Sequence, residues 1–392
     1  MLPYITITFI PIITFCLEWS KEIKNSHKRF TMMFLAICYI LFSALRWECG
    51  TDWEQFYGLF YSFNDVPFTE VFNHRYNWTT DSSTGGKIYE PGYALMNWLF
   101  VNTTGSFNAM LIFYTTIIIF IYYKLSWLYA SKYPIYLFTF FITADFFYWR
   151  AGFASAICFF SIQYIISRKF LKFLLCCLVA TSMHNSAILF LPFYFVLNRK
   201  FSNGLLISSF LFCSFIGSTS ILYGIVEYVA NILSTFRSEF GLISKLVLYL
   251  YTNSDNSIAK LIMSIFKYGI FIVIFCLYKK YFKIESERSD ATKNNTDYFK
   301  FNKSDIYNVM LTSYVIGSCI WLLFRSQLTI FARMAIYFTG SFPVLNVMVL
   351  SILPSNKRKI FFGFVILNVF YIAFAKFLTF EELLIPYKTV FN

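Results

Sequence analysis

The chain has 392 residues, of which 58% are apolar and only 14% are charged, whereas soluble domains carry roughly 25% charged residues. A soluble fold of this length could not bury so much apolar surface, so the composition excludes an ordinary soluble protein and favours an integral membrane protein. The net charge of +13 would suit a nucleic-acid-binding protein, but the basic residues stand in short clusters between apolar runs, as orientation signals do in membrane proteins.

The apolar runs predict an all-α fold, a polytopic transmembrane bundle of about twelve spans, in one membrane domain that covers residues 1–392. No basic stretch precedes the first run, which is therefore expected to be a span and not a signal peptide. Short helices are expected in the outer-face loops. The predicted spans are residues 2–17, 30–45, 106–123, 134–149, 151–167, 170–183, 186–197, 203–223, 259–278, 305–324, 331–353 and 359–378.

The distribution of Lys and Arg predicts the orientation. These residues concentrate in the linkers 18–30, 124–133, 168–172, 198–202, 279–304 and 354–359. Basic linkers stay in the cytoplasm, so both termini are expected outside, together with a first periplasmic loop, 46–90, and a second periplasmic segment, 224–258. The basic loop 279–304 contains few hydrophobic residues, and its part from residue 281 is expected to be flexible.

Two segments leave alternatives open. Residues 91–102 are apolar but short, so we expect a re-entrant or interfacial helix; a full span there would invert everything downstream. Residues 170–197 form either two short helices that meet near His184 or one long helix.

Ionisable residues gather at the predicted outer ends of the spans. Charges are costly in a membrane, about 2.5–3.5 kcal/mol each at a helix centre, so those that persist need a reason. Guanidinium groups match the oxygens of phosphate. No nucleotide-binding motif occurs, which points to a lipid diphosphate at the outer leaflet. The residues concerned are Arg46, Glu48, Asp52, Glu90, Asp145, Arg150, His184, Arg325 and Arg333.

The cysteine and aromatic residues say less about function than the ionisable residues do. Eight of the nine cysteines lie in or beside apolar runs, Cys49 lies in the first outer loop, and no spacing suggests a disulfide framework or a zinc site. Several Trp and Tyr residues of the outer loops could stack on sugar rings, although such residues are also common as interfacial anchors. They include Trp47, Trp53, Tyr57, Trp78, Tyr89, Tyr93 and Trp149.

Five short motifs in order resemble the EpsG/Wzy family of polysaccharide polymerases. They are Arg46-Trp-Glu-Cys-Gly-Thr-Asp52-Trp-Glu-Gln-Phe-Tyr57, Tyr89-Glu90-Pro-Gly-Tyr93, Arg150-Ala-Gly-Phe-Ala154, Ala180-Thr-Ser-Met-His184-Asn-Ser186-Ala and Arg333-Met-Ala-Ile-Tyr337-Phe, with a weaker Ile385-Pro386-Tyr387 near the end. The stretch 200–325 carries little of the resemblance.

The resemblance implies a glycosyltransferase of the bacterial inner membrane, with its active site facing the periplasm. A glycan on undecaprenyl diphosphate would be the donor and a repeat unit on the same lipid the acceptor, with no metal or cofactor. A chain-length regulator is a candidate partner; nucleic acid is not.

The resemblance and the residue types together suggest roles. Arg150 and Arg333 would hold the leaving diphosphate, assisted by Arg325 or Arg46. The general base would be Asp52, Glu90 or His184, and the sequence does not choose among them. Trp53, Tyr57, Tyr93 and Tyr337 would contact substrate.

Plainer interpretations stand beside these roles. The arginines could be interfacial anchors, Asp52 and Glu90 could be helix caps, and His184 could be a turn residue. At the level of the whole protein, the alternatives are an O-antigen ligase or another lipid-linked glycosyltransferase, and a flippase or transporter of lipid-linked oligosaccharide.

Overall fold

The computed structural model divides the chain into two compact units. The first consists of residues 1–162, 171–191 and 346–392, and the second of residues 163–170 and 192–345. The structure describes residues 2–20, 23–50, 52–77, 86–143, 147, 150–219, 221, 224–225, 227–228, 232, 258–291, 301–324, 332–354, 356–367 and 387–391.

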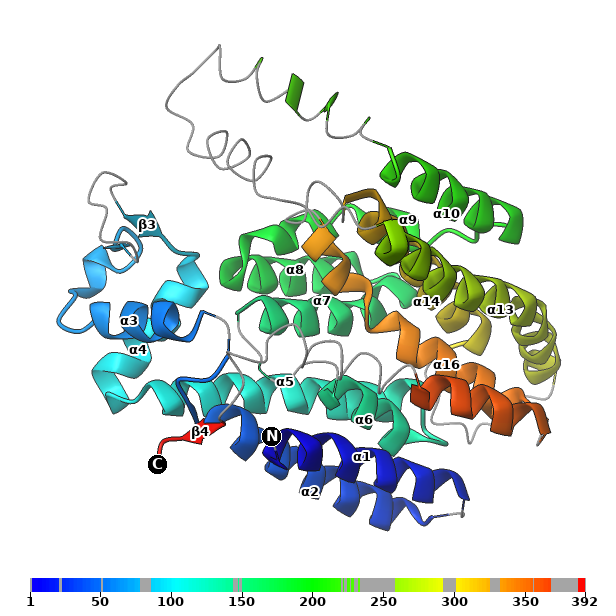
Figure 1. Cartoon of the computed structure of the whole chain (residues 1–392), viewed down its shortest axis with the longest axis horizontal. Helices are drawn as coiled ribbons and strands as arrows, with labels where there is room; N and C mark the ends of the chain where they lie inside the picture. The colour runs from blue at the N-terminus through cyan, green and yellow to red at the C-terminus, as the bar shows by residue number, and fades with distance from the viewer. Residues whose placement is uncertain are drawn as a thin grey trace. The chain divides into compact units, whose positions relative to one another are not determined.

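The first unit is built from helices that pack along their length (Figure 1). Helix α2 packs against α5 and α6, α1 packs against α2 and α6, and the shorter α4 packs against α3 and α5. The bounds are α1 Leu2–Ser20, α2 Asn25–Ala44, α3 Trp53–Ser62, α4 Pro91–Thr104, α5 Phe107–Tyr129, α6 Pro134–Thr143, α7 Arg150–Ile166, α8 Phe170–Met183, and the 3-10 helices η1 Phe68–Glu70 and η3 Asn185–Phe190.

The second unit is organised around one buried helix, α14, which contacts α9, α10, α13 and η4. Most of its length is enclosed, and its Tyr307 hydroxyl donates to the Phe275 carbonyl of α13 at 2.7 Å. The bounds are α9 Phe193–Leu197, α10 Asn203–Gly217, α13 Ile258–Ala291, α14 Lys303–Phe324 and η4 Arg333–Phe338. The residues of α7, α8 and α16 (Ser341–Ile352) are divided between the two units: the last turn of α7, the first residue of α8 and the first turn of α16 belong to the second unit.

The predicted helical fold is confirmed, with the addition of two short antiparallel ladders. β2 (Arg75–Tyr76) pairs with β3 (Lys87–Ile88) inside the first outer segment, and β1 (Arg46–Trp47) pairs with β4 (Lys388–Thr389). The second ladder joins the C-terminal strand to the segment that follows α2, with Arg46 opposite Thr389. The spacing of apolar residues does not predict the pairing of β1 with β4, because these two strands are more than three hundred residues apart in the sequence.

Four of the described helical segments are long and apolar enough to cross a membrane: 107–129, 261–284, 303–324 and 333–352. Large apolar side chains also face outward, among them Leu277 at 73% exposure and Leu171 at 72%. Exposed apolar surface of this extent is what a bilayer covers. The protein is therefore a membrane protein, and the expectation of about twelve spans stays a prediction.

Several boundaries differ from the sequence-based expectation. The polar stretch predicted to be flexible from residue 281 is instead helical as far as Ala291, because Lys, Glu and Arg favour helix and extend one that is already nucleated. Residues 91–102 form α4, as expected for a short helix. The alternative of two short helices near His184 is confirmed, since α8 ends at Met183 and η3 begins at Asn185. Segment 224–258 lies almost entirely outside the described residues.

Candidate active site

The start of α4 carries three residues of the second motif. Glu90 occupies the N-cap position, Pro91 is the first helical residue and Gly92 follows. Pro suits this position, because the first amides of a helix need no partner within the helix. The Glu90 side chain makes no capping hydrogen bond, so it does not serve as the helix cap that the plainer interpretation proposed.

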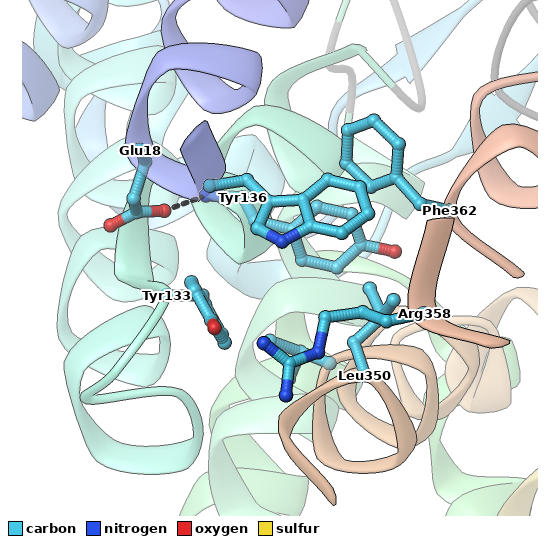
Figure 2. Close-up of a pocket in the computed structure, with 8 residues that line it drawn as sticks. Glu18, Tyr133, Tyr136, Leu350, Arg358 and Phe362 are labelled. Carbon is cyan, nitrogen blue, oxygen red and sulfur yellow. Dashed lines mark hydrogen bonds between the residues drawn. The ribbon is translucent and has the colours of Figure 1, made fainter. Parts of the chain in front are cut away.

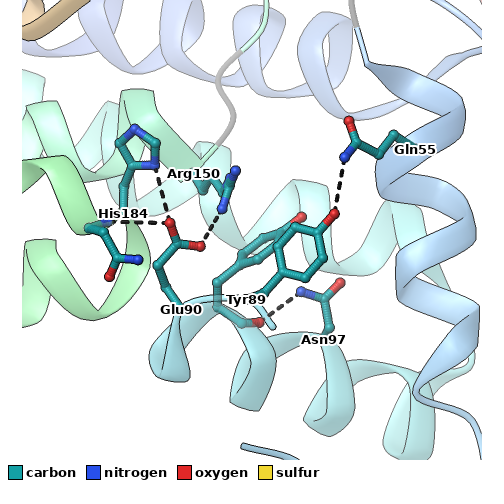
Figure 3. A network of polar contacts seen from close by, with 8 residues as sticks. Gln55, Tyr89, Glu90, Asn97, Arg150 and His184 are labelled. Atoms are coloured by element: carbon teal, nitrogen blue, oxygen red, sulfur yellow. Dashed lines mark hydrogen bonds and ion pairs between the residues drawn. The ribbon is translucent and has the colours of Figure 1, made fainter. Parts of the chain in front are cut away.

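The Glu90 carboxylate instead joins two other helical segments (Figure 3). Its Oε2 accepts a hydrogen bond from Nη1 of Arg150, the first residue of α7. Its Oε1 lies 3.7 Å from Nδ1 of His184 and accepts a hydrogen bond of 3.3 Å from the backbone N–H of Asn185. Three of the five sequence motifs therefore meet at one carboxylate.

Gly92 allows α4 to approach the end of α8 this closely. A Cβ at this position would lie 2.5 Å from the Ser182 hydroxyl and 2.9 Å from the Ser182 carbonyl oxygen. Any side chain would therefore push α4 away from the turn that carries His184. The need for glycine here is steric, since two backbones approach each other.

Aromatic rings surround the Arg150 guanidinium. Its central carbon lies 5.6 Å from the ring centre of Phe56, 5.3 Å from Tyr89 and 5.5 Å from Tyr93, within the range of cation–π attraction. Burial raises the pKa of both tyrosine hydroxyls, and the neighbouring Arg150 charge partly opposes that rise. Both hydroxyls therefore stay neutral at physiological pH.

Hydrogen bonds hold this aromatic wall in place (Figure 3). The Gln55 side-chain amide of α3 donates to the Tyr89 hydroxyl at 3.0 Å. The Asn97 amide donates to the Tyr93 carbonyl oxygen at 2.7 Å, one turn earlier in α4. Substrate contact by Tyr93 stays a prediction; its ring is 2% exposed and packs against the arginine.

Exposure differs among the three ionisable groups. The Glu90 side chain is 6% exposed, Arg150 13% and His184 27%. Arg150 makes no side-chain hydrogen bond other than that to Glu90 within the part of the chain that the structure describes. The site thus presents a guanidinium that is bound to a buried carboxylate and has donors to spare, and an imidazole whose Nδ1 lies 3.7 Å from the same carboxylate.

Arg46 lies in a different environment, fully enclosed in the first unit. Its guanidinium donates to the Ser43 carbonyl and lies 4.3 Å from the ring centre of Phe147 and 5.5 Å from that of Trp53. Burial lowers the pKa of Arg46 to about 10. The guanidinium has no exposed surface at which a diphosphate could bind.

The other predicted site residues are distributed as follows. Asp52 is exposed and adopts a left-handed backbone, with φ of 61°, and its side chain makes no hydrogen bond to a residue of the described segments. Trp53 is buried, and its ring stacks on half-buried Tyr57 with 6.2 Å between the ring centres. Arg333, which is exposed, and Tyr337, which is buried, belong to the second unit. Arg325, Asp145, Trp78 and Trp149 lie outside the described residues.

Comparison with known proteins agrees with the motifs. The model of the EpsG family matches residues 29–389, nearly the whole chain. The chain belongs to the EpsG family. Neither the comparison with curated proteins nor that with solved structures gave a match.

Membership of the EpsG family, which includes Wzy-type polymerases, gives the site its chemical context: a membrane glycosyltransferase of the polymerase type. Three participants were not predicted from the sequence: the Asn185 amide, Gln55 and Phe56. Gln55 and Phe56 lie within the first motif, so their position was a usable signal. The backbone amide of Asn185 carries no sequence signal, because every residue except proline has one.

Proposed function

We propose that the protein polymerises undecaprenyl-diphosphate-linked oligosaccharide repeat units, as in an O-antigen, at the periplasmic face of a bacterial inner membrane. One observation supports this most: the Glu90 carboxylate is shared by Arg150 and by the turn that carries His184. An arginine and a histidine placed beside one buried acid supply the two functions that transfer from a lipid diphosphate needs.

The first function is stabilisation of the leaving group. As the bond from the anomeric carbon to the diphosphate oxygen breaks, negative charge develops on that oxygen. Arg150 is suited to bind it, because its guanidinium has unused donors and matches phosphate oxygens in shape. The rings of Phe56, Tyr89 and Tyr93 keep the side chain in place without consuming those donors.

The second function is removal of a proton from the acceptor hydroxyl. We assign it to His184, which is more exposed than Glu90 and faces it through Nδ1. That leaves Nε2 to accept the proton while the acceptor oxygen bonds to the anomeric carbon and the diphosphate departs with the electron pair of the broken bond. A carboxylate beside one ring nitrogen orients the ring and favours protonation at the other.

Glu90 then acts through the other two residues. Its oxygens already accept hydrogen bonds from Arg150 and from the Asn185 amide, so they are poorly placed to take a proton from the substrate. Of the three candidate bases, His184 is therefore preferred over Glu90, and over Asp52, which nothing in the described part of the molecule orients.

The function is tested by gel analysis of surface polysaccharide from cells that lack the protein, complemented with variants. Wild type should restore a ladder of many repeats, whereas Arg150→Gln and His184→Gln should give a single-repeat product. His74→Gln is the matched control, because His74 belongs to the same outer segment as Glu90 but contacts Ser62 and Phe63. Loss of all capped product in the deletion strain would contradict a polymerase and indicate a ligase or flippase.

A further inference from the structure

A pocket in the first unit lies among residues that none of the five motifs contains. Glu18 and Trp19 come from the end of α1, Tyr133 precedes α6 and Tyr136 lies in its first turn. The remaining residues come from the last third of the chain; these are Val347, Leu350, Arg358 and Phe362 (Figure 2). All eight belong to the first unit. The lining is mostly apolar and aromatic, and its two ionisable residues are Glu18 and Arg358.

The acid in this pocket is already satisfied. The Glu18 carboxylate accepts from the backbone N–H groups of Ile135, at 3.3 Å, and Tyr136, at 2.9 Å, and so caps the start of α6. Lys28 lies 3.6 Å from it and also donates to the Lys132 carbonyl oxygen. The charges of Glu18 and Lys28 thus compensate each other, and the positive charge of Arg358 is left uncompensated in the pocket.

The Arg358 guanidinium is fixed by two hydrogen bonds and has one nitrogen left to bind an anion. Its Nε and Nη2 both donate to the Leu353 carbonyl oxygen, at 3.0 and 2.7 Å, just past the end of α16. This fixes the plane of the guanidinium and leaves Nη1 without a partner among the described residues. Figure 2 shows the guanidinium extending toward Tyr133. A guanidinium with a fixed plane loses little entropy when it binds phosphate.

Three further cations lie next to lining residues in the sequence. Lys357 and Lys359 flank Arg358, Lys132 precedes the lining residue Tyr133, and all three are exposed. None of the three forms an ion pair with any residue that the structure describes. Their positive charge beside apolar surface and interfacial aromatic rings is the combination that recognises an anionic lipid headgroup.

We propose that the surface at the mouth of this pocket, around Arg358, binds an anionic glycerophospholipid. The phosphate would lie on Nη1 of Arg358, with Lys132, Lys357 and Lys359 around the headgroup. The acyl chains would lie against the exposed apolar side chains that follow Arg358 in the same helical segment, Ile360 and Phe364. The basic linkers concerned, 18–30, 124–133 and 354–359, are those expected on the cytoplasmic side, where the leaflet surface is negative. The site is independent of the proposed polymerase function.

The test measures lipid retained by the purified full-length protein. The protein is delipidated in neutral detergent, incubated with phosphatidylglycerol or phosphatidylcholine, and examined by native mass spectrometry. Phosphatidylglycerol should be retained in preference to phosphatidylcholine and should raise the melting temperature. The Lys357→Gln/Lys359→Gln variant, which keeps Arg358 and its helix intact, should bind phosphatidylglycerol on the order of tenfold more weakly, and Arg358→Gln more weakly still.

The matched control is Lys280→Gln/Lys283→Gln, which removes the same charge from exposed positions on α13 in the second unit. It should retain phosphatidylglycerol like wild type. Equal retention of both lipids would overturn the proposal, as would equal weakening by the control pair. Complete competition by inorganic phosphate at the same concentration would show that the site recognises a phosphate and not a lipid, which also overturns it.

Discussion

Glu90 and Arg150 are sixty residues apart in sequence, and their side chains form a partly buried ion pair in the first unit. The pair links the start of α4 to the start of α7. Because the same carboxylate also holds the turn after α8, the ion pair fixes the geometry of the site as well as its charge.

The pair should be strongly coupled in a double-mutant cycle. Glu90→Gln or Arg150→Gln alone should lower the free energy of unfolding by about 3 kcal/mol, because each leaves a buried charge without its partner. The double variant should lose clearly less than the sum of the two. The exposed pair Glu48–Lys388 is the comparison, and its coupling should be much weaker, because solvent screens both charges. Additive losses at Glu90 and Arg150 would argue against the ion pair.

Gly92→Ala should abolish polymer formation although alanine is a better helix former. The new methyl group would lie 2.5 Å from the Ser182 hydroxyl, so α4 would shift and carry Glu90 away from His184. Adding Ser182→Ala removes the hydroxyl and should restore part of the activity. The rescue should be incomplete, because the backbone carbonyl oxygen of residue 182 would still lie 2.9 Å from the new methyl group. Gly204→Ala is the control, since that position has open space around it. Wild-type ladders from Gly92→Ala would refute the steric argument.

His184→Gln should reduce the turnover rate by about two to four orders of magnitude, as expected for loss of a general base, while the KM for the lipid-linked donor changes little. Asp52→Asn should leave the turnover rate within a few fold of wild type, because Asp52 is exposed and has no hydrogen-bonded partner in the described segments. Initial rates with a fixed acceptor measure both. A larger loss for Asp52→Asn than for His184→Gln would move the base to Asp52.

Arg46 should affect folding and not substrate affinity. Its guanidinium is completely enclosed and packs on Phe147, so Arg46→Met and Arg46→Lys should both lower the yield and melting temperature of the protein. The KM per folded molecule should be unchanged. A selective rise in KM with Arg46→Met that Arg46→Lys does not share would instead place Arg46 on the diphosphate.

Cys49 should resist alkylation until the C-terminal strand is removed. The thiol is 1% exposed, and burial raises its pKa. Since only the thiolate reacts, a raised pKa keeps the group protonated and unreactive at pH 8, with reactivity growing as pH increases. Deleting residues 387–392 removes the Lys388 backbone that contacts the sulfur. Peptide mapping after maleimide treatment should then detect Cys49, and equal labelling of the full-length protein would contradict the docked strand.

The sequence predicted the helical, membrane-embedded fold because long apolar runs and basic linkers are local signals. It also predicted Glu90, Arg150 and His184 as site residues, because charge at the ends of apolar helices is costly and conspicuous. It did not predict that Glu90 bridges the other two, since residue types and spacing do not specify which way a side chain turns.

Two kinds of structural feature could not be predicted from the sequence. The first is contact between distant segments. For example, Tyr387 stacks on Phe42 with 4.9 Å between the ring centres, and both rings pack against the buried cluster that contains Cys49. The second is burial, which separates Arg46 from Arg150 although both are arginines at the ends of apolar runs. Neither depends on local periodicity, and both follow from tertiary packing.

The most direct test of the proposed mechanism uses purified protein in liposomes with undecaprenyl-diphosphate-linked repeat units as the only substrate. Wild type should form a ladder and release one undecaprenyl diphosphate for each new linkage. Arg150→Gln and His184→Gln should do neither, although both remain folded. Linkages formed at the wild-type rate by either variant, or formed without release of the lipid diphosphate, would contradict the mechanism.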